Sequence, residues 1–293
     1  MRAWLAVVVC AVTLSALTAC SSPPEGVDGD LTNGWSIPPA PTQFRPLTGR
    51  CFDSIAAMSP MSGYAPFDCA ERHLAETFYV GDLTGPAAAA DTAETTALPA
   101  AGQACSRQAA GFTGGDWRTG QITVRPVLPG PVAWKAGARW FRCDIAQIDI
   151  GGQRTVGRTG TLKGALAGAA KLKLRCFNPK VQGNRVRDMK AVDCAGAHHA
   201  EFVGLWAPPD ATQALLDDEA KSANGCRSTI AGYTGIPDDG DVQYRAGWIG
   251  FSPTAGDWNV GVRDVQCFLW IEDVAMKGSY RGVGTAKLPI KYN

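Results

Sequence analysis

The sequence predicts an α+β protein built from two tandem homologous domains, each a small, mostly antiparallel sheet with one main helix, held by disulfides. Three observations predict this fold class. Cysteines recur at nearly constant spacing, the side chains around them recur as well, and each half has strand-like segments around one helix-like segment. With 293 residues, of which 45% are hydrophobic, the chain is long enough for two ordinary domains after an N-terminal leader.

The first segment is typical of a lipoprotein leader. Met1-Arg2 is followed by an apolar run over residues 3–12, which is too short to span a membrane, and later by Leu17-Thr18-Ala19-Cys20. The latter pattern is a lipobox, in which small residues precede a cysteine that receives lipid. We expect residues 1–19 to be a signal peptide and Cys20 to carry acyl chains such as palmitate, which together hold a protein firmly to a membrane. The alternative is an ordinary secretory signal with a chance cysteine.

The segment that follows predicts a flexible spacer behind the lipidated cysteine. Residues 20–46 are rich in Pro, Ser, Gly and Asp, a composition typical of unstructured linkers. No later stretch approaches the roughly 18 apolar residues of a membrane-spanning helix. We therefore expect the rest of the chain at the outer face of the cytoplasmic membrane, anchored there by its N-terminal lipid.

The cysteines beyond the leader fall into two sets of four, once Cys10 and Cys20 are set aside. The offsets between matching members are 125, 125, 121 and 124 residues. The sets are Cys51, Cys69, Cys105 and Cys143, and Cys176, Cys194, Cys226 and Cys267. The flanking side chains repeat in the same order, with R-C-F at 50–52 and 175–177, D-C-A at 68–70 and 193–195, A-G-F/Y-T-G at 110–114 and 231–235, and W-x2-G-x-R-x3-C at 134–143 and 258–267. This regularity indicates a duplication with its joint near residues 165–171, so that the copies span 47–167 and 168–293.

Local patterns place strands and helices in each copy. β-Branched and aromatic runs predict strands over residues 75–80, 121–127, 140–150, 200–206 and 260–271. An alanine-rich segment from residue 86 towards 103 predicts a weak helix in the first copy. A stronger helix is predicted over 211–223, with a stop or kink at Asn224-Gly225. The A-G-F/Y-T-G stretches predict turns after these helices, where glycine accepts a positive φ.

Paired cysteines are typical of exported proteins. Four cysteines allow three pairings in each copy, and we favour Cys51–Cys69 with Cys105–Cys143, and Cys176–Cys194 with Cys226–Cys267. The first bond of each set would close a hairpin-like excursion, and the second would join the helix end to a late strand. Each such loop could add roughly 3 kcal/mol by restricting the unfolded chain.

The repeated polar residues are the candidates for chemistry. His73 and His198 each follow a cysteine by four residues and precede Glu76 and Glu201 by three. A functional interpretation is a metal or acid–base site, to which His199 could add. The structural interpretation is a histidine in a turn that bonds a backbone carbonyl, and we favour it because two lone ligands rarely hold zinc. These five residues are the possible binding residues, and no metal or other cofactor is expected.

Trp134 and Trp258 precede Arg139 and Arg263 at equal spacing. A tryptophan packed in the core against a disulfide is the favoured interpretation, and an arginine stacked on the indole is the other. Neither copy contains a G-x-S-x-G, S-x-x-K or H-E-x-x-H signature. The sequence therefore gives no catalytic residue.

The assembled pattern resembles the actinobacterial septum formation family. The residues that carry the resemblance are Cys51-Phe52, Cys69, His73, Glu76, Cys105, Trp134, Gly137, Arg139, Cys143 and Gly160-Thr161, and the second copy repeats them from Cys176 to Gly278-Ser279. The resemblance covers nearly all of the mature chain, twice. It implies an envelope protein that acts in septum formation, and it brings no catalytic residues with it.

Charge and architecture then separate three hypotheses. Cleavage before Cys20 removes Arg2, so that 28 basic side chains become 27, against 27 acidic ones, and a net charge near zero favours no nucleic-acid partner. We expect a non-catalytic envelope module that binds a division protein or cell-wall glycan, with avidity from two copies. The alternatives are an enzyme that uses the His/Glu motif, with or without a metal, and a small-molecule carrier with a pocket between the copies.

Overall fold

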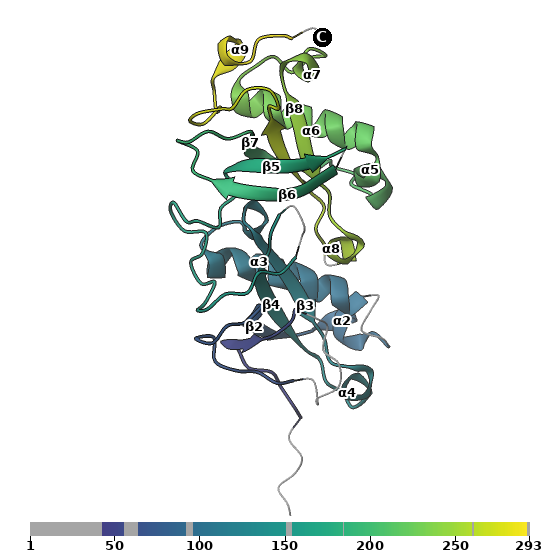
Figure 1. Cartoon of the computed structure of the whole chain (residues 1–293). Coiled ribbons are helices and arrows are strands. Elements are labelled where there is room, and N and C mark those ends of the chain that lie inside the picture. The colour runs from purple at the N-terminus through teal and green to yellow at the C-terminus, as the bar shows by residue number, and fades with distance from the viewer. Residues whose placement is uncertain are drawn as a thin grey trace, which may run out of the picture. The chain divides into compact units, whose positions relative to one another are not determined.

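A computed structural model describes residues 43–55, 64–91, 96–150, 154–183, 185–259 and 261–291. Cys10, Cys20, the predicted signal peptide and nearly all of the predicted spacer lie outside these residues. From Phe44 onward the chain forms one compact unit. It is an α+β structure with two antiparallel sheets and four disulfides, which confirms the predicted fold class (Figure 1).

The first sheet has four strands in the order β1-β2-β4-β3. Their bounds are Arg50–Phe52 for β1, Ala75–Asp82 for β2, Ile122–Val127 for β3 and Trp140–Gln147 for β4. The central pair β2·β4 is antiparallel and shifts register between Thr77 and Tyr79. Seven of the eight β4 residues are buried, because the strand lies between two neighbours under a helix.

One long helix covers this sheet. The helical segments of the first half are α2 (Gly85–Ala89), α3 (Leu98–Thr113), the 3-10 helix η3 (Trp117–Thr119) and α4 (Pro131–Lys135). The small residues Ala101, Cys105 and Ala109 of α3 are buried, which lets the helix pack closely on the sheet. They share one apolar cluster with Val124 and Ile145 of the strands.

The second sheet has five strands in the order β6-β5-β7-β9-β8. Their bounds are Cys176–Gln182 for β5, Arg185–Val192 for β6, Ala200–Trp206 for β7, Gly247–Phe251 for β8 and Val265–Trp270 for β9. β5 pairs with β7 only at Cys176 and Phe177, so the rest of the β5–β6 hairpin extends beyond that pairing.

This hairpin covers one face of the second sheet, and helix α6 (Glu219–Thr234) covers the other. On the hairpin side, Phe177 and Met189 pack with Ile249 and Phe268 of the sheet. On the helix side, Cys226 and Ile230 pack with Cys267 and Leu269. The three strands β7, β9 and β8 therefore lie between two layers.

The helices of the second half correct the sequence prediction. The bounds are α5 (Gln213–Asp217), α6, α7 (Val242–Arg245), α8 (Ala255–Asn259) and α9 (Gly284–Lys287). The chain breaks at Asp218, whose carboxylate caps the Lys221 amide, and Asn224-Gly225 lies inside α6. The expected stop at 224–225 is therefore wrong: a cap decides where this helix begins, and Gly225 is tolerated because the Trp206 ring packs against it.

The glycine stretches end the helices rather than follow them. Gly114 has φ 76° and Gly235 has φ 75°, and each donates its backbone N–H to a carbonyl four residues earlier. These are left-handed C-caps, so the positive φ was correctly predicted. The residues before them form the last helical turn, and α3 consequently runs ten residues past the expected end at 103.

The four disulfides join the favoured pairs. Cys51–Cys69 and Cys176–Cys194 each close a loop of 18 residues, and Cys105–Cys143 and Cys226–Cys267 join the long helix to a central strand. Both members of each helix–strand pair are completely buried. No helix in the described part of the chain combines the length and the apolar character needed to cross a membrane.

Candidate functional site

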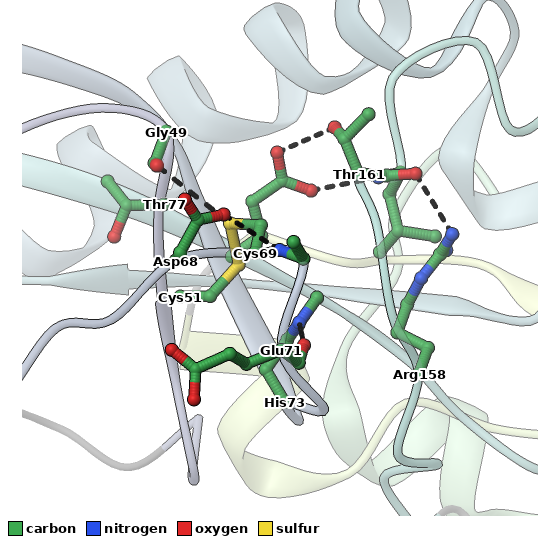
Figure 2. Close-up of a disulfide and its surroundings, with 12 residues drawn as sticks. Gly49, Cys51, Asp68, Cys69, Glu71, His73, Thr77, Arg158 and Thr161 are labelled. Carbon is green, nitrogen blue, oxygen red and sulfur yellow. Dashed lines mark hydrogen bonds between the residues drawn. A yellow bond between two sulfur atoms is a disulfide. The ribbon is translucent and has the colours of Figure 1, made fainter.

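The repeated histidines lie in the turn that follows the second cysteine of each half. His73 and Arg158 exchange backbone hydrogen bonds, both of 2.9 Å. In the second half His198 and Met276 do the same, at 3.1 and 2.7 Å. Each histidine thus joins the loop after the disulfide to the segment that follows the last strand. Figure 2 shows His73 in the loop after the Cys51–Cys69 disulfide, and Arg158 with its contact to Thr161.

Both imidazole rings are buried and bond the backbone. The Nδ1 atom of His73 lies 2.8 Å from the carbonyl oxygen of Glu71, and that of His198 lies 2.9 Å from the carbonyl oxygen of Gly196. The residues are 2% and 0% exposed. A carbonyl only accepts, so Nδ1 must carry a proton in both rings. This is the turn histidine of the favoured structural interpretation.

The repeated glutamates are buried and anchor a second loop. Glu76 accepts a hydrogen bond of 2.7 Å from Thr161 Oγ1 and one of 2.8 Å from the Leu162 amide. Glu201 accepts the equivalent bonds from Ser279 Oγ, at 2.6 Å, and from the Tyr280 amide, at 2.7 Å. The carboxylates therefore hold the Gly-Thr and Gly-Ser turns that follow the fourth cysteine.

The second half adds a tyrosine to this network. The Tyr233 hydroxyl donates to Glu201 at 2.5 Å, and Arg281 stacks 4.5 Å from the Tyr233 ring centroid. Burial raises the pKa of Tyr233, and the hydrogen bond to Glu201 raises it further. The corresponding residue of the first half is Phe112, so only Glu201 has this third donor.

The histidine and glutamate side chains of each motif therefore bond different partners and not each other. The ring of His199 bonds a third element, with Nδ1 2.8 Å from the Ile271 carbonyl oxygen. Among the described residues, no group of three or more His, Cys, Asp and Glu side chains is placed to hold a metal ion. The arrangement supports the backbone of two loops in each half.

The tryptophan–arginine pairs combine both interpretations made from the sequence. Arg139 lies 4.2 Å from the Trp134 ring centroid, and Arg263 lies 3.6 Å from that of Trp258. Trp134 is only 4% exposed and belongs to the same apolar cluster as Cys105. Its pairing with arginine is a cation–π contact at the edge of the core. The tryptophan is thus a core residue and also carries a stacked arginine.

Sequence reasoning missed a buried ion pair on β4. Arg142 Nη2 lies 2.8 Å from Asp144 Oδ2, and Thr77 Oγ1 donates to Asp144 Oδ1 at 2.6 Å. Arg142 also stacks on the Phe52 ring, 4.3 Å from its centroid. Burial raises the pKa of Asp144 against the attraction of Arg142. The second half has Phe268 in place of Asp144, so no repeat could reveal the pair.

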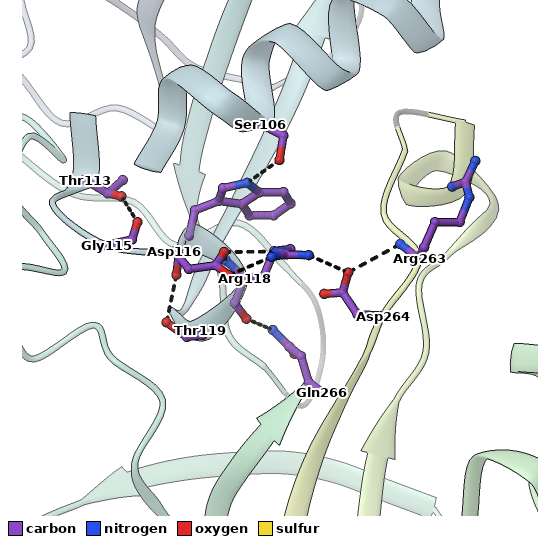
Figure 3. Close-up of polar contacts among 10 residues, drawn as sticks. Ser106, Thr113, Gly115, Asp116, Arg118, Thr119, Arg263, Asp264 and Gln266 are labelled. Carbon is purple, nitrogen blue, oxygen red and sulfur yellow. Dashed lines mark hydrogen bonds and ion pairs between the residues drawn. The ribbon is translucent and has the colours of Figure 1, made fainter. Parts of the chain in front are cut away.

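A polar network joins the two halves (Figure 3). Arg118 binds Asp116 on its own element, and its Nη1 donates to Asp264 Oδ1 of the second half at 2.9 Å. The Gln266 amide donates to the Arg118 carbonyl at 2.8 Å. A second ion pair links Arg125 of β3 to Asp257 of α8 at 2.6 Å. These residues fix how the sheets meet.

The joint also encloses a pocket of about 140 Å³. Its walls include Trp117, Arg118 and Arg125 of the first half and Phe251, Asp257 and Asp264 of the second. Ligand pockets usually have volumes of about 300–1,000 Å³. The pocket that the carrier hypothesis requires is present at the expected place, but it is smaller than this range.

A larger groove lies in the second half, along β8. It has a volume of about 700 Å³. Its lining comes from the tip of the β5–β6 hairpin, β8 itself, the end of β9, and the α5–α6 segment. The aromatic residues Trp248, Phe251 and Trp270 contribute to its lining. Two of them, Trp248 and Trp270, are tryptophans without a counterpart in the first half.

The comparison with known proteins identifies one family. The model of a family described as septum formation matches residues 48–267 as a single stretch, which begins before β1 and ends within β9. No curated protein and no solved structure matches the chain.

Proposed function

Because the chain belongs to the septum formation family, we propose that it is a lipid-anchored envelope protein that acts in septum formation by binding rather than by catalysis. Membership of the family indicates a cell-division or envelope-related protein. The anchor, the side of the membrane and the binding role are the steps that we add.

The anchor and the location rest on the leader and the disulfides. The lipobox around Cys20 predicts diacylglyceryl attachment and signal-peptide removal. All eight cysteines of the two sets are paired, as is typical of proteins in oxidising compartments. Both features favour the outer face of the cytoplasmic membrane.

We also propose that the protein is a tandem duplication, with copies over 47–167 and 168–293. Contacts recur at the matching positions of both halves: the histidine bridge, the glutamate-anchored turn, the tryptophan–arginine stack, and the glycine cap of the long helix. Two copies of one fold offer two surfaces that could bind neighbouring sites with avidity.

The observation that carries the binding role is the structural use of the repeated polar residues. Every repeated histidine and glutamate is buried and engaged by backbone or hydroxyl groups of its own half. A general acid or base must instead reach a substrate proton. The metal-dependent and acid–base alternatives have no such observation in their favour.

The test combines localisation with complementation in the native host. A fluorescent fusion of the full chain should gather at the division site, and its Cys20→Ala variant should lose the membrane. Deletion should delay septation, and a folded His199→Ala variant, which removes the half-buried ring that bonds the Ile271 carbonyl, should restore it fully. An even distribution along the envelope would contradict the septal role. Failure of His199→Ala at normal abundance and location would favour the enzyme alternative.

A further inference from the structure

The sheet edges of this protein are protected unequally. Natural proteins protect exposed sheet edges with charges, prolines or a covering segment. The β6 edge carries the exposed charged residues Arg185, Arg187, Asp188 and Lys190. On β3, Pro126 cannot donate a backbone hydrogen bond and Arg125 is held by Asp257 of the other half.

Strand β8 has none of these protections. Its sequence is Gly-Trp-Ile-Gly-Phe, without charge or proline. Within the described residues it pairs with β9 alone. Every second residue of an edge strand turns its N–H and C=O groups away from its neighbour, and these groups of β8 therefore face the groove.

The groove forms a slot around this edge. On one side stand Leu216, Asp217 and Glu219 of the helical layer, and on the other stand Val181 and Arg185 of the hairpin. Trp248 belongs to the helix-side cluster, whereas Ile249 belongs to the hairpin-side cluster. The two layers thus flank β8 on both faces and leave open the position of one more strand.

We propose that this slot binds an extended polypeptide segment of a partner protein, which pairs with β8 as an added strand. This inference rests on the proposed binding function and names the chemistry of the partner. In such complexes, main-chain hydrogen bonds provide affinity and pockets for alternate side chains provide specificity. The five residues of β8 span about 17 Å, enough to pair with a segment of about five residues.

A second copy of the chain fits the slot less well. An edge-to-edge dimer needs two flat, accessible edges. Residues of the helical layer and of the hairpin line the groove on either side of β8, and a second copy would bring the same two walls against them. A single extended strand brings no such walls, so the groove suits it better.

A glycan is also less favoured by the geometry of the tryptophans. A Cβ atom at Gly250 would lie 2.7 Å from the Trp248 ring, and one at Gly247 would lie 3.0 Å from the Trp270 ring. Both indoles therefore rest on the backbone of β8 and pack into the two clusters. They shield glycines of the strand and do not stand free as stacking platforms.

The experiment measures amide hydrogen exchange of β8 in the purified mature chain. The probe is a synthetic octapeptide of alternating valine and threonine, and its control is the same peptide with alternate amides N-methylated. At a peptide concentration ten times its dissociation constant, we expect the slot-facing amides of β8 to exchange about tenfold more slowly. The N-methylated peptide should give no protection, because it cannot complete the ladder.

Two variants separate the slot from the fold. Trp248→Lys places a charge on the edge and should abolish protection by the peptide. Trp206→Lys is the matched control, since Trp206 is also a partly buried tryptophan packed on the helix-side cluster but lies on β7. Should both variants fail to fold, the comparison of the two peptides on the unmodified chain still decides the question.

Three results would overturn the proposal. The first is equal protection by both peptides, or no protection up to about 1 mM peptide. The second is protection of β8 by chitotetraose in place of the peptide, which would assign the groove to glycan. The third is protection that rises with protein concentration alone, which would assign it to a second copy. None of these touches the septal localisation on which the proposed function is tested, so the two failures are distinguishable.

Discussion

At the scale of single residues, one buried carboxylate in each half performs the same structural task with different strength. Glu76 receives two donors and Glu201 receives three. A buried carboxylate needs such donors, because burial without them is unfavourable by several kcal/mol. The turn after the last strand is therefore held to β2 or β7 by charge-assisted hydrogen bonds.

This difference predicts unequal costs of substitution. Glu76→Gln and Glu201→Gln should each lower the free energy of unfolding by about 1–3 kcal/mol, because one amide N–H then faces a donor. The loss should be greater for Glu201→Gln, and Tyr233→Phe should reduce the difference. Urea denaturation measures all three, with the exposed Glu71→Gln as control. Equal losses for the two glutamates would contradict the role of Tyr233.

The sequence showed which of these residues recur in both halves, but it did not predict their hydrogen-bond partners. Repetition of His73 and Glu76 in the second half marked them as significant. It could not show that Thr161, 85 residues along the chain, bonds Glu76, or that Met276 pairs with His198. Arg142 and Asp144 were missed because, in the sequence of β4, these charged residues alternate with apolar ones. Such a pattern usually indicates that the charged side chains lie on the solvent face of a strand.

The buried ion pair predicts an asymmetric response. Asp144→Asn leaves the Arg142 guanidinium buried without its counter-charge, and because arginine cannot lose its proton we expect a loss of about 3–5 kcal/mol. Arg142→Met should cost less, about 1–3 kcal/mol, because burial already raises the pKa of Asp144 and the carboxyl can take up a proton once the cation is gone. Thermal unfolding of the two variants checks the order, and a larger loss for Arg142→Met would contradict it.

At the scale of elements, local patterns located the strands better than the helix ends. The strand prediction over 200–206 is correct to the residue, since alternating apolar residues lie between two pairing partners. The strand predicted over 260–271 comprises only Val265–Trp270 in the structure. Before it, Arg263 stacks on the tryptophan and Val262 belongs to the turn. Strands β1, β5, β6 and β8 were not predicted. β1 has only three residues, proline and charge interrupt β5, charge interrupts β6, and glycine interrupts β8.

The disulfides of one half should contribute unequally to stability. Closing loops of 18 and 41 residues removes chain entropy worth about 3.2 and 3.9 kcal/mol. Replacing Cys226 and Cys267 by alanine should therefore be the more destabilising change, and it also removes sulfur atoms from a fully buried site. The corresponding change at Cys176 and Cys194 is the comparison, and urea midpoints provide the measurement. A larger loss at Cys176 and Cys194 would contradict this order.

At the scale of the whole molecule, residues outside the repeat decide how the halves meet. Arg118, Asp264 and Gln266 carry the joint, and none belongs to a motif that recurs in both halves. A repeat in the sequence indicates what the two halves have in common. The surfaces through which the halves contact each other must instead differ between them. For this reason the sequence predicted two modules but gave no indication of the contact between them.

The joint should make the two halves unfold together. Within the described residues, Arg118→Met leaves the buried Asp264 with a single weak backbone contact of 3.4 Å, and we expect it to lower stability by about 1–3 kcal/mol. It should also broaden the calorimetric transition, because the halves then lose a shared ion pair. Arg154→Met, which removes an exposed pair with Asp149 in the first half, is the matched control. A transition as narrow as that of the control would show that the apolar contacts alone couple the halves.

The same joint should weaken in acid. Burial alone would raise the pKa of Asp116, but hydrogen bonds from the side chain and backbone of Arg118 outweigh it and hold that pKa below the usual 3.8. Since the folded pKa lies below the unfolded one, the contribution of Asp116 to stability is present above about pH 3.8. It is lost as the pH falls through the folded pKa.

We therefore expect the stability difference between the unmodified chain and Asp116→Asn to be constant from pH 7 to about pH 4 and to shrink below it. All other carboxylates are common to both proteins, so the difference isolates Asp116. Urea denaturation at low ionic strength, repeated at a series of pH values, measures this stability difference. Guanidinium is avoided because its high salt concentration screens charges. A stability difference that grows on acidification would mean that burial, and not Arg118, controls the pKa of this carboxyl. The ion pair would then result from the contact between the halves and would not stabilise it.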